Sequence, residues 1–423
     1  MDRQAVPFRR SEPVPGVRLV TERMPHTRTA AIGLWVDRGA RDEPWEIAGA
    51  SHLLEHLLFK GTERRTARDI AHAFDAVGGE VNAFSTKEYT CYYARVLETD
   101  VAMATDVLLD MFTSALLREE DLASERKVVL EEIHMTRDAP DDWVHDLFVE
   151  TAWPDHPLGR EVIGTTETVG SMDRNALLAF YREGYTPGRV IVAASGDIDH
   201  ASLAEQVSAV FEADERFRRL PSDPPQIASG RAVYDQRTIE QVNLVWGAAS
   251  PPRDSEDRFA LSLLNVLYGS SMSSRLFQEI REDRGLAYAV FSGYQSYVES
   301  GLFSVYAGTS EATADEVMRI VRSQAASVAA GEVTPEELDR ARGHVKGSLV
   351  LGLDDPGGRM ARLGKGELVW GDVLGVDEVL ARIDAVTAED VTRVAQQVFG
   401  GGFVLASVGP VAPGSLDRHT DPL

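Results

Sequence analysis

The sequence predicts an α+β protein made of two homologous α/β-roll domains, each a sheet packed with helices, related by internal duplication. The 423 residues suggest about two to four domains and allow a large core. A polar, proline-bearing segment, "RRLPSDPPQIASGRA", divides the chain into parts that show the same order of strand-like and helix-like patterns. We therefore expect an N-terminal domain over 1–217, a linker over 218–232 and a C-terminal domain over 233–423.

The elements of the two halves can be matched in order. Each half opens with alternating apolar residues, which predict a strand, and continues with a leucine-rich helix. Strand-like runs follow, and then a helix with an acidic start. The matched pairs are 29–40 with 242–250, 50–59 with 260–269, 80–96 with 286–308, and 117–132 with 333–348. The stretch "DDPGGRM" at 354–360 is expected to be a turn between helices.

The composition indicates a globular protein with a strong negative charge. The formal net charge is −24, which would repel phosphates and argues against nucleic acid as a partner. The charge is compatible with basic peptides as ligands, and it can equally serve solubility alone. No apolar run approaches the roughly 18 residues of a membrane helix. The N-terminal stretch lacks the apolar core of a signal peptide, so the expected location is cytoplasmic.

Metal-ligating side chains must come from histidine and carboxylate. Cys91 is the only cysteine, which excludes an intrachain disulfide and disfavours a cysteine-based metal site.

The stretch "SHLLEHLLFKGT" (51–62) predicts a helix with leucines on one face and with His52, Glu55 and His56 on the other. Histidines four residues apart can both reach one metal ion, and Glu55 would lie beside that ion. The spacing alone is equally compatible with the solvated face of an ordinary amphipathic helix. The order His-x-x-Glu-His is more specific, because it is the inverted zinc-binding motif.

The duplication assigns this feature to the first half. The matching helix of the second half carries Ser262, Asn265 and Val266 at the three positions. The second half therefore has the same scaffold without the candidate ligands.

A third ligand is expected in "ERKVVLEEIHM" (125–135), because a zinc hydrolase site uses three protein ligands and one open position. Glu125 and Glu132 are seven residues apart and share one helix face, while Glu131 points away from it. The same face is expected to carry Leu122, Val128, Val129 and Ile133. Unpaired buried carboxylates are costly, and a metal ion would remove that cost, which favours Glu132 as ligand. A neutralising arginine or a shallow, wet groove would also remove it.

Taken together, these residues resemble the pitrilysin-like, or M16, metallopeptidases over nearly the whole chain. Residues 52–56 match the inverted zinc motif and are followed by the typical "FKGT" of 59–62. Glu132 lies 76 residues after His56, where the family places its third zinc ligand. The stretches 78–96 and 269–290 look like the family's substrate-binding edge strand and its second-half motif. The length and the duplicated halves resemble the short subfamily, which includes mitochondrial processing peptidase and its bacterial homologues.

This resemblance implies metal-assisted peptide hydrolysis inside a chamber. His52, His56 and Glu132 would bind one Zn²⁺ per chain, and Glu55 would act as general base. Glu125 would orient a ligand histidine. Extended peptides, with basic ones favoured by the acidic walls, would pair with the strand that carries Asn82, Ala83 and Phe84.

Two further residues, Arg281 and Tyr288, match a family pair that contacts the scissile carbonyl. They lie in the half without ligands, and in short members a partner subunit supplies that half. The resemblance therefore implies a homodimer in which each subunit completes the active site of the other. The alternatives are a non-catalytic chamber or partner subunit of the same fold, and a metal-dependent hydrolase of another kind.

Overall fold

The computed structural model describes residues 8–214 and 223–423. Residues 218–222 of the expected linker lie outside the described residues, and 223–230 form neither helix nor strand. The chain forms two compact units. Unit 1 comprises Met1–Ile133, Glu161–Pro221 and Val350–Gly375, and unit 2 comprises His134–Arg160, Ser222–Leu349 and Val376–Leu423. Neither unit is continuous, so both differ from the continuous domains 1–217 and 233–423 expected from the sequence.

Unit 1 contains a six-stranded sheet of order β1-β2-β6-β3-β5-β4, with β4 at one edge. The β2–β6 pair is parallel, and the other neighbours are antiparallel. The strands are β1 (Arg9–Val14), β2 (Val17–Arg23), β3 (Thr29–Val36), β4 (Glu80–Ser85), β5 (Thr90–Leu97) and β6 (Val190–Gly196). The expected strand over 29–40 is thus β3, and 80–96 forms the hairpin of β4 and β5.

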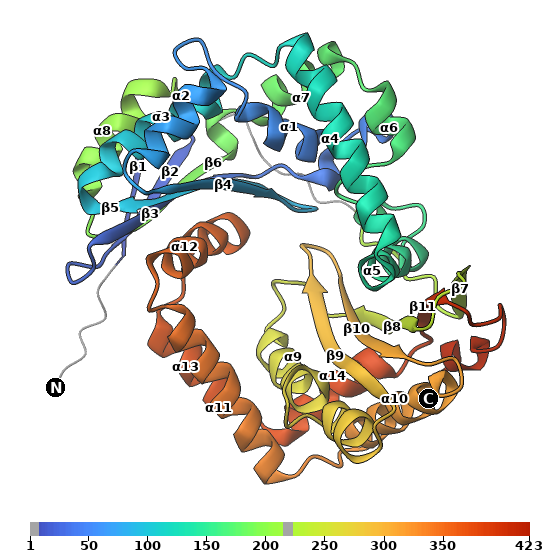
Figure 1. The fold of residues 1–423 in the computed structure, drawn as a ribbon. Helices are drawn as coiled ribbons and strands as arrows, with labels where there is room; N and C mark the ends of the chain where they lie inside the picture. The colour runs from blue at the N-terminus through green and yellow to red at the C-terminus, as the bar shows by residue number, and fades with distance from the viewer. Residues whose placement is uncertain (1–7, 215–222) are drawn as a thin grey trace. The chain divides into compact units, whose positions relative to one another are not determined.

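Helices cover both faces of this sheet (Figure 1). The larger core lies on the face that holds α1 (Ala50–Leu58), α3 (Val101–Ser114) and the first part of α4 (Glu119–Asp138). The same unit contains α2 (Ala67–Asp75), α6 (Thr166–Ser171), α7 (Arg174–Gly184) and α8 (His200–Val210).

The opposite face is covered by α12 (Pro356–Trp370), which comes from the second half of the chain. The expectation of a turn at 354–360 is therefore wrong from Pro356 onward, where the helix begins. Two glycines permit the close approach of α12 to the sheet. A Cβ atom on Gly33 would lie 2.6 Å from Met360 Sδ, and one on Gly364 would lie 2.1 Å from Trp35 Nε1.

Unit 2 repeats this plan with a five-stranded sheet of order β7-β11-β8-β10-β9. This is the order β2-β6-β3-β5-β4 of unit 1, with the parallel pair in the same place. The strands are β7 (Arg231–Gln236), β8 (Val242–Ser250), β9 (Ala287–Ser296), β10 (Gly301–Thr309) and β11 (Val404–Gly409). The predicted α+β class with duplicated sheet-and-helix domains is confirmed.

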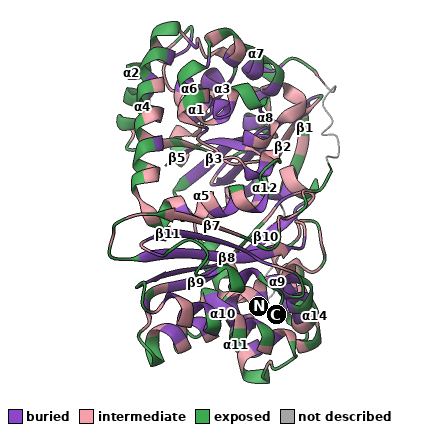
Figure 2. Cartoon of the chain, turned by 90° about the vertical axis from the view of Figure 1, so that its right-hand side faces the viewer, coloured by how far each residue is buried: buried purple, intermediate pink, exposed green. Residues whose placement is uncertain are grey.

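The faces of the second sheet are covered in the same way, and buried residues are concentrated in its inner strands β8, β10 and β11 (Figure 2). One face packs against α9 (Arg258–Asn265), α10 (Ala314–Ala329) and α14 (Ala388–Phe399), and the other against α5 (Pro140–Ala152) from the first half. The expected helix over 260–269 changes to a π-helical turn at Val266–Ser270. The same half of the chain also contains α11 (Pro335–Gly352), α13 (Val376–Ala385) and a π-helical segment at Phe277–Asp283. Among the described residues, no helix has the length and apolarity needed to cross a bilayer.

Candidate metal centre

Helix α1 presents the histidine motif because its two faces differ as the sequence predicts. Its four leucines are completely buried, whereas His52, Glu55 and His56 are half-buried. The N-terminus of the helix is held by Glu43, which is only 5% exposed. The Glu43 carboxylate accepts hydrogen bonds from the backbone N–H groups of Gly49 at 2.8 Å and Ser51 at 2.6 Å. A negative charge at a helix N-terminus is favourable, so Glu43 fixes the start of the helix that carries the motif.

Helix α4 supplies the carboxylates. Leu122, Val129 and Ile133 anchor it in the core, and each is completely buried. Val128 was expected on the same face but is 43% exposed, because it lies toward the edge of the apolar arc. Glu131 is exposed, as predicted.

The three predicted ligands converge. Glu132 Oε2 lies 3.9 Å from His52 Nε2 and 3.6 Å from His56 Nε2. Among residues 8–214 and 223–423, these three form the one cluster of at least three potential ligand residues, with ligand atoms within 4.8 Å of one another. Neighbouring ligands of a tetrahedral zinc ion, with bonds of about 2.0–2.1 Å, are separated by roughly 3.3 Å. The observed separations are close to that value.

The chemistry of the donor atoms also fits a metal ion. Glu132 Oε2 is buried and has no hydrogen-bond partner among the described residues, although two imidazole nitrogens face it. Burial and the neighbouring His56 lower the pKa of His52 to about 4, so His52 is neutral at neutral pH and has a lone pair to offer. An unpaired buried oxygen beside a neutral imidazole is costly, and a divalent cation would satisfy both groups.

Glu55 lies one helical turn from His52. Burial raises the pKa of Glu55, while hydrogen bonding to Ser85 on β4 opposes this effect and the charge of Glu132 adds to it. Its Oε2 atom is buried without a hydrogen-bond partner among the described residues. A carboxylate with a raised pKa and an unused oxygen is suited to accept a proton at this place.

The contact between Glu55 of α1 and Ser85 of the edge strand β4 has a counterpart in unit 2. Asn265 of α9 occupies the position that matches Glu55, and its Oδ1 accepts a hydrogen bond of 2.7 Å from Ser292 on β9. The stretch "FS" occurs in both edge strands, at 84–85 and at 291–292. The serine that holds the helix was therefore retained in both halves, whereas the carboxylate is present in only one.

Glu125 supports a ligand rather than joining the cluster. Its Oε2 lies 3.1 Å from His56 Nδ1, and its Oε1 lies 2.6 Å from Lys60 Nζ. Burial opposes the ionisation of Glu125, but the hydrogen bonds from Lys60 and His56 outweigh it and lower its pKa. An ionised Glu125 accepts the proton of Nδ1, which leaves Nε2 of His56 free to bind metal.

The predicted substrate strand, β4, is an edge strand that pairs only with β5 among the described strands. Its side chains alternate: Ala83 packs against the helical core, whereas Asn82 and Phe84 are exposed on the other face. The Phe84 ring makes an edge contact with Trp35, with a centroid separation of 5.7 Å. The free edge of β4 can accept an extended chain.

Arg281 and Tyr288 lie together in unit 2. The guanidinium of Arg281 lies 5.2 Å from the centroid of the Tyr288 ring, and Tyr288 is 80% exposed. Arg281 belongs to the π-helical segment and Tyr288 to β9, the edge strand of the second sheet.

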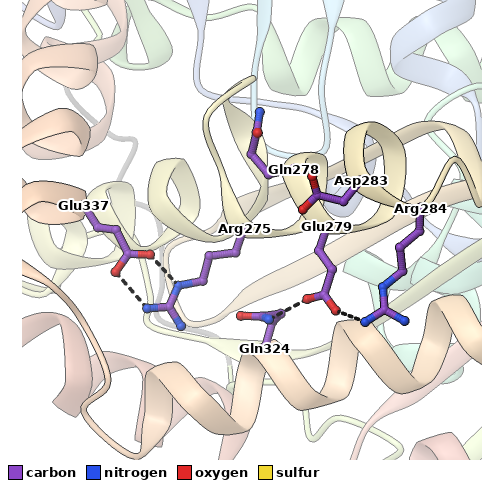
Figure 3. Close-up of a pocket in the computed structure, with 7 residues that line it drawn as sticks. All are labelled: Arg275, Gln278, Glu279, Asp283, Arg284, Gln324 and Glu337. Atoms are coloured by element: carbon purple, nitrogen blue, oxygen red, sulfur yellow. Dashed lines mark hydrogen bonds and ion pairs between the residues drawn. The ribbon is translucent and has the colours of Figure 1, made fainter.

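Unit 2 also has a polar depression of about 530 Å³ (Figure 3). It is lined by Arg275, Gln278, Glu279, Asp283, Arg284, Gln324 and Glu337. Its two arginines pair with its two glutamates: Arg275 bonds Glu337 at 2.8 Å, and Arg284 bonds Glu279 at 2.7 Å. None of the predicted site residues lines it, and the internal pairing indicates a structural network.

Sequence reasoning missed three residues that organise the centre, namely Glu43, Lys60 and Ser85. The sequence marks Lys60 only as part of "FKGT", and Glu43 lies in no recognisable pattern. Ser85 could have been found from the repeated "FS".

Comparison with known proteins agrees with this arrangement. Residues 18–166 match the family model described as insulinase (peptidase family M16), and residues 171–344 match the peptidase M16 inactive domain. An uncharacterized zinc protease of Streptomyces coelicolor is 46% identical over 96% of this chain and 90% of its own length. Another of these, YmxG of Bacillus subtilis, is 39% identical over 93% of this chain and 96% of its own length.

Solved structures have the same fold. A protease from Helicobacter pylori superposes with a TM-score of 0.88 at 22% identity, over 96% of this chain and 100% of that one. A peptidase M16 inactive domain from Pseudomonas fluorescens superposes with a TM-score of 0.89 at 19% identity, over 96% of this chain and 98% of that one. With family models matching both halves and relatives this similar over nearly the full length, the chain belongs to the M16 family of peptidases.

Proposed function

We propose that this protein is a zinc-dependent endopeptidase that hydrolyses peptides or unfolded segments, with Glu55 as general base. The proposal depends on one observation. His52, His56 and Glu132 bring their potential ligand atoms together, and Glu132 Oε2 is buried there without a hydrogen-bond partner among the described residues. One Zn²⁺ bound there would lower the pKa of a water molecule to about 7 and polarise a peptide carbonyl. The relatives named zinc proteases support the same metal and reaction class.

The residues of this chain then have distinct tasks. Glu55 accepts the proton of the attacking water and returns it to the leaving amine. His56 keeps its orientation because Glu125 holds Nδ1. The substrate lies extended along the free edge of β4, past Asn82 and Phe84, and its backbone provides most of the affinity with little sequence preference.

We further propose a homodimer, located in the cytoplasm, whose chamber admits peptides and favours basic ones because the protein carries a net charge of −24. In this arrangement Arg281 and Tyr288 of one subunit would contact the scissile carbonyl in the site of the other and stabilise the negative charge that develops on its oxygen. Mixing inactive Glu55→Gln subunits with inactive Arg281→Ala subunits tests this sharing. Mixed dimers should regain one working site, and no recovery after confirmed subunit exchange would argue against a shared site.

Metal analysis combined with a cleavage assay on a broad peptide pool tests the main proposal. Glu55→Gln should keep about one zinc per chain and lose at least about a hundredfold in kcat. Glu131→Gln, which changes an exposed neighbour of Glu132, is the matched control and should cleave normally. Wild-type protein that binds zinc but cleaves nothing would favour the alternative, a non-catalytic subunit of the same fold.

A further inference from the structure

The loop after α1 brings one lysine to the metal centre. Lys60 follows the last turn of the helix, and its backbone N–H bonds the carbonyl of Leu57 at 3.1 Å. The next residue, Gly61, has φ +122°, and a Cβ there would lie 2.9 Å from the carbonyl oxygen of Arg65. The backbone on both sides of Lys60 is therefore fixed, so its side chain extends from a defined position.

The loop is secured a second time by buried charge. Arg64 and Arg65 both bond Asp110, at 3.0 Å and 2.6 Å, and the Asp110 side chain is 1% exposed. Thr62 donates a further hydrogen bond of 2.8 Å to the same carboxylate. The position of Lys60 thus depends on α3, where Asp110 lies, as well as on α1.

Lys60 contacts one oxygen of the Glu125 carboxylate, and the other oxygen contacts His56, a predicted ligand. Lys60 Nζ lies 2.6 Å from Glu125 Oε1, and Glu125 Oε2 lies 3.1 Å from His56 Nδ1. The Glu125 side chain is 7% exposed. With both oxygens engaged, the plane of this carboxylate is set by Lys60, and the ring of His56 is set by the carboxylate.

The two histidines differ in this respect. Nδ1 of His52 is buried and has no hydrogen-bond partner among the described residues. His56 is therefore the ligand whose orientation is fixed by hydrogen bonding, and the preorganisation of the centre depends on its chain of contacts. Charge points the same way: three carboxylates (Glu55, Glu125 and Glu132) exceed one divalent cation by a single negative charge, which Lys60 cancels.

We propose that Lys60 is a positioning residue for zinc: through Glu125 it holds His56 in the orientation that binds the metal. This inference rests on the proposed zinc site but not on peptide hydrolysis. Removing the lysine leaves Glu125 free to rotate away from His56, so zinc should bind more weakly and leave faster.

The test is the zinc dissociation constant of the full-length protein, measured by competition with a chromophoric chelator after the metal has been stripped. Lys60→Met should bind zinc about 10–100-fold more weakly than wild type, the usual cost of losing a contact behind a ligand. Lys60→Arg keeps a charged donor and should lie closer to wild type than to Lys60→Met. Lys127→Met removes an exposed lysine of α4 and should change nothing.

A double-variant cycle separates positioning from general damage. In a Glu125→Gln background, Lys60→Met should weaken zinc binding by less than about twofold, because the contact it breaks no longer orients a carboxylate. An undiminished effect in that background would overturn the proposal, as would a Lys60→Met constant within about twofold of wild type. The melting temperatures of the metal-free variants show whether each is folded. Wild-type protein that binds zinc without cleaving peptides would defeat only the proposed function, whereas wild-type protein that binds no zinc would overturn both.

Discussion

Replacing Glu43 with alanine should loosen the helix that carries the histidine motif. The carboxylate accepts two backbone N–H groups at the start of α1, at 2.8 Å and 2.6 Å, and is 5% exposed. Hydrogen bonds to a charged group contribute about 1.5–3 kcal/mol each, so two of them amount to about 3–6 kcal/mol. At about 1.4 kcal/mol per factor of ten, the smaller figure alone corresponds to at least a hundredfold change in local opening.

The assay is amide hydrogen exchange, followed by mass spectrometry, on a peptide that spans α1 in the metal-free protein. Glu43→Ala should accelerate exchange in this peptide at least about a hundredfold. Glu46→Ala, which removes an exposed carboxylate three residues away, should leave it unchanged. An acceleration in Glu43→Ala of less than about threefold would show that the helix start does not depend on this carboxylate, and the reasoning would be refuted.

Three further predictions concern stability. The pKa of His52 is lowered from 6.5 to about 4 in the folded protein, so the unfolded chain takes up the proton first. The metal-free protein should therefore lose about 3 kcal/mol between pH 6.5 and 4, and urea titrations should show a smaller loss for His52→Gln. The pKa of Glu55 is raised, so its ionisation disfavours folding. Metal-free Glu55→Gln should be more stable than wild type at pH 7 in the same titrations, with an advantage that fades toward pH 4.5; equal stability at pH 7 would contradict this. Gly364→Ala places a Cβ 2.1 Å from Trp35 Nε1 and should lower the melting temperature through an overpacking cost of about 1–3 kcal/mol. Gly343→Ala, in an open part of α11, should raise the melting temperature slightly, and similar effects of the two changes would refute the packing argument.

The helix faces that carry the cluster of His52, His56 and Glu132 could be predicted, because the pattern of each helix is local. The leucines of α1 and the apolar residues of α4 determine which way each helix turns, so helical geometry gives the faces on which His52, His56 and Glu132 lie. That Glu132 joins the two histidines, 76 residues after His56, was implied by the cost of burying its carboxylate and by the family resemblance. The misplacement of Val128 shows the limit of that method. Counting residues around a helix gives the direction in which each side chain points. How many of those directions are buried depends on the neighbouring elements that pack against the helix.

The contacts of Lys60 and Glu43 could not be predicted, because no local pattern indicates their partners, whereas the family resemblance implied that Glu125 orients a ligand histidine. Lys60 and Glu125 are 65 positions apart, and neither motif indicates that they meet. Glu43 precedes its helix by seven residues, outside the usual capping position, so no capping rule identifies it. The repeated order of strands and helices in the two units followed from the duplication, but the source of the second helical layer on each sheet did not.

That second layer has a consequence for dividing the protein. The sheet of unit 1 is closed by α12, from beyond residue 350, and the sheet of unit 2 by α5, from before residue 153. A fragment ending at the linker would lack α12 and would expose the apolar surface around Trp35. The same fragment would carry α5, whose apolar side includes Phe148, but would lack the second sheet against which that side packs. Neither half is a self-sufficient folding unit, yet each contains the helix that the other lacks. A break in the linker should therefore be tolerated when both fragments are produced together, since reassembly would restore both layers, and should be lethal to the fold when either fragment is produced alone.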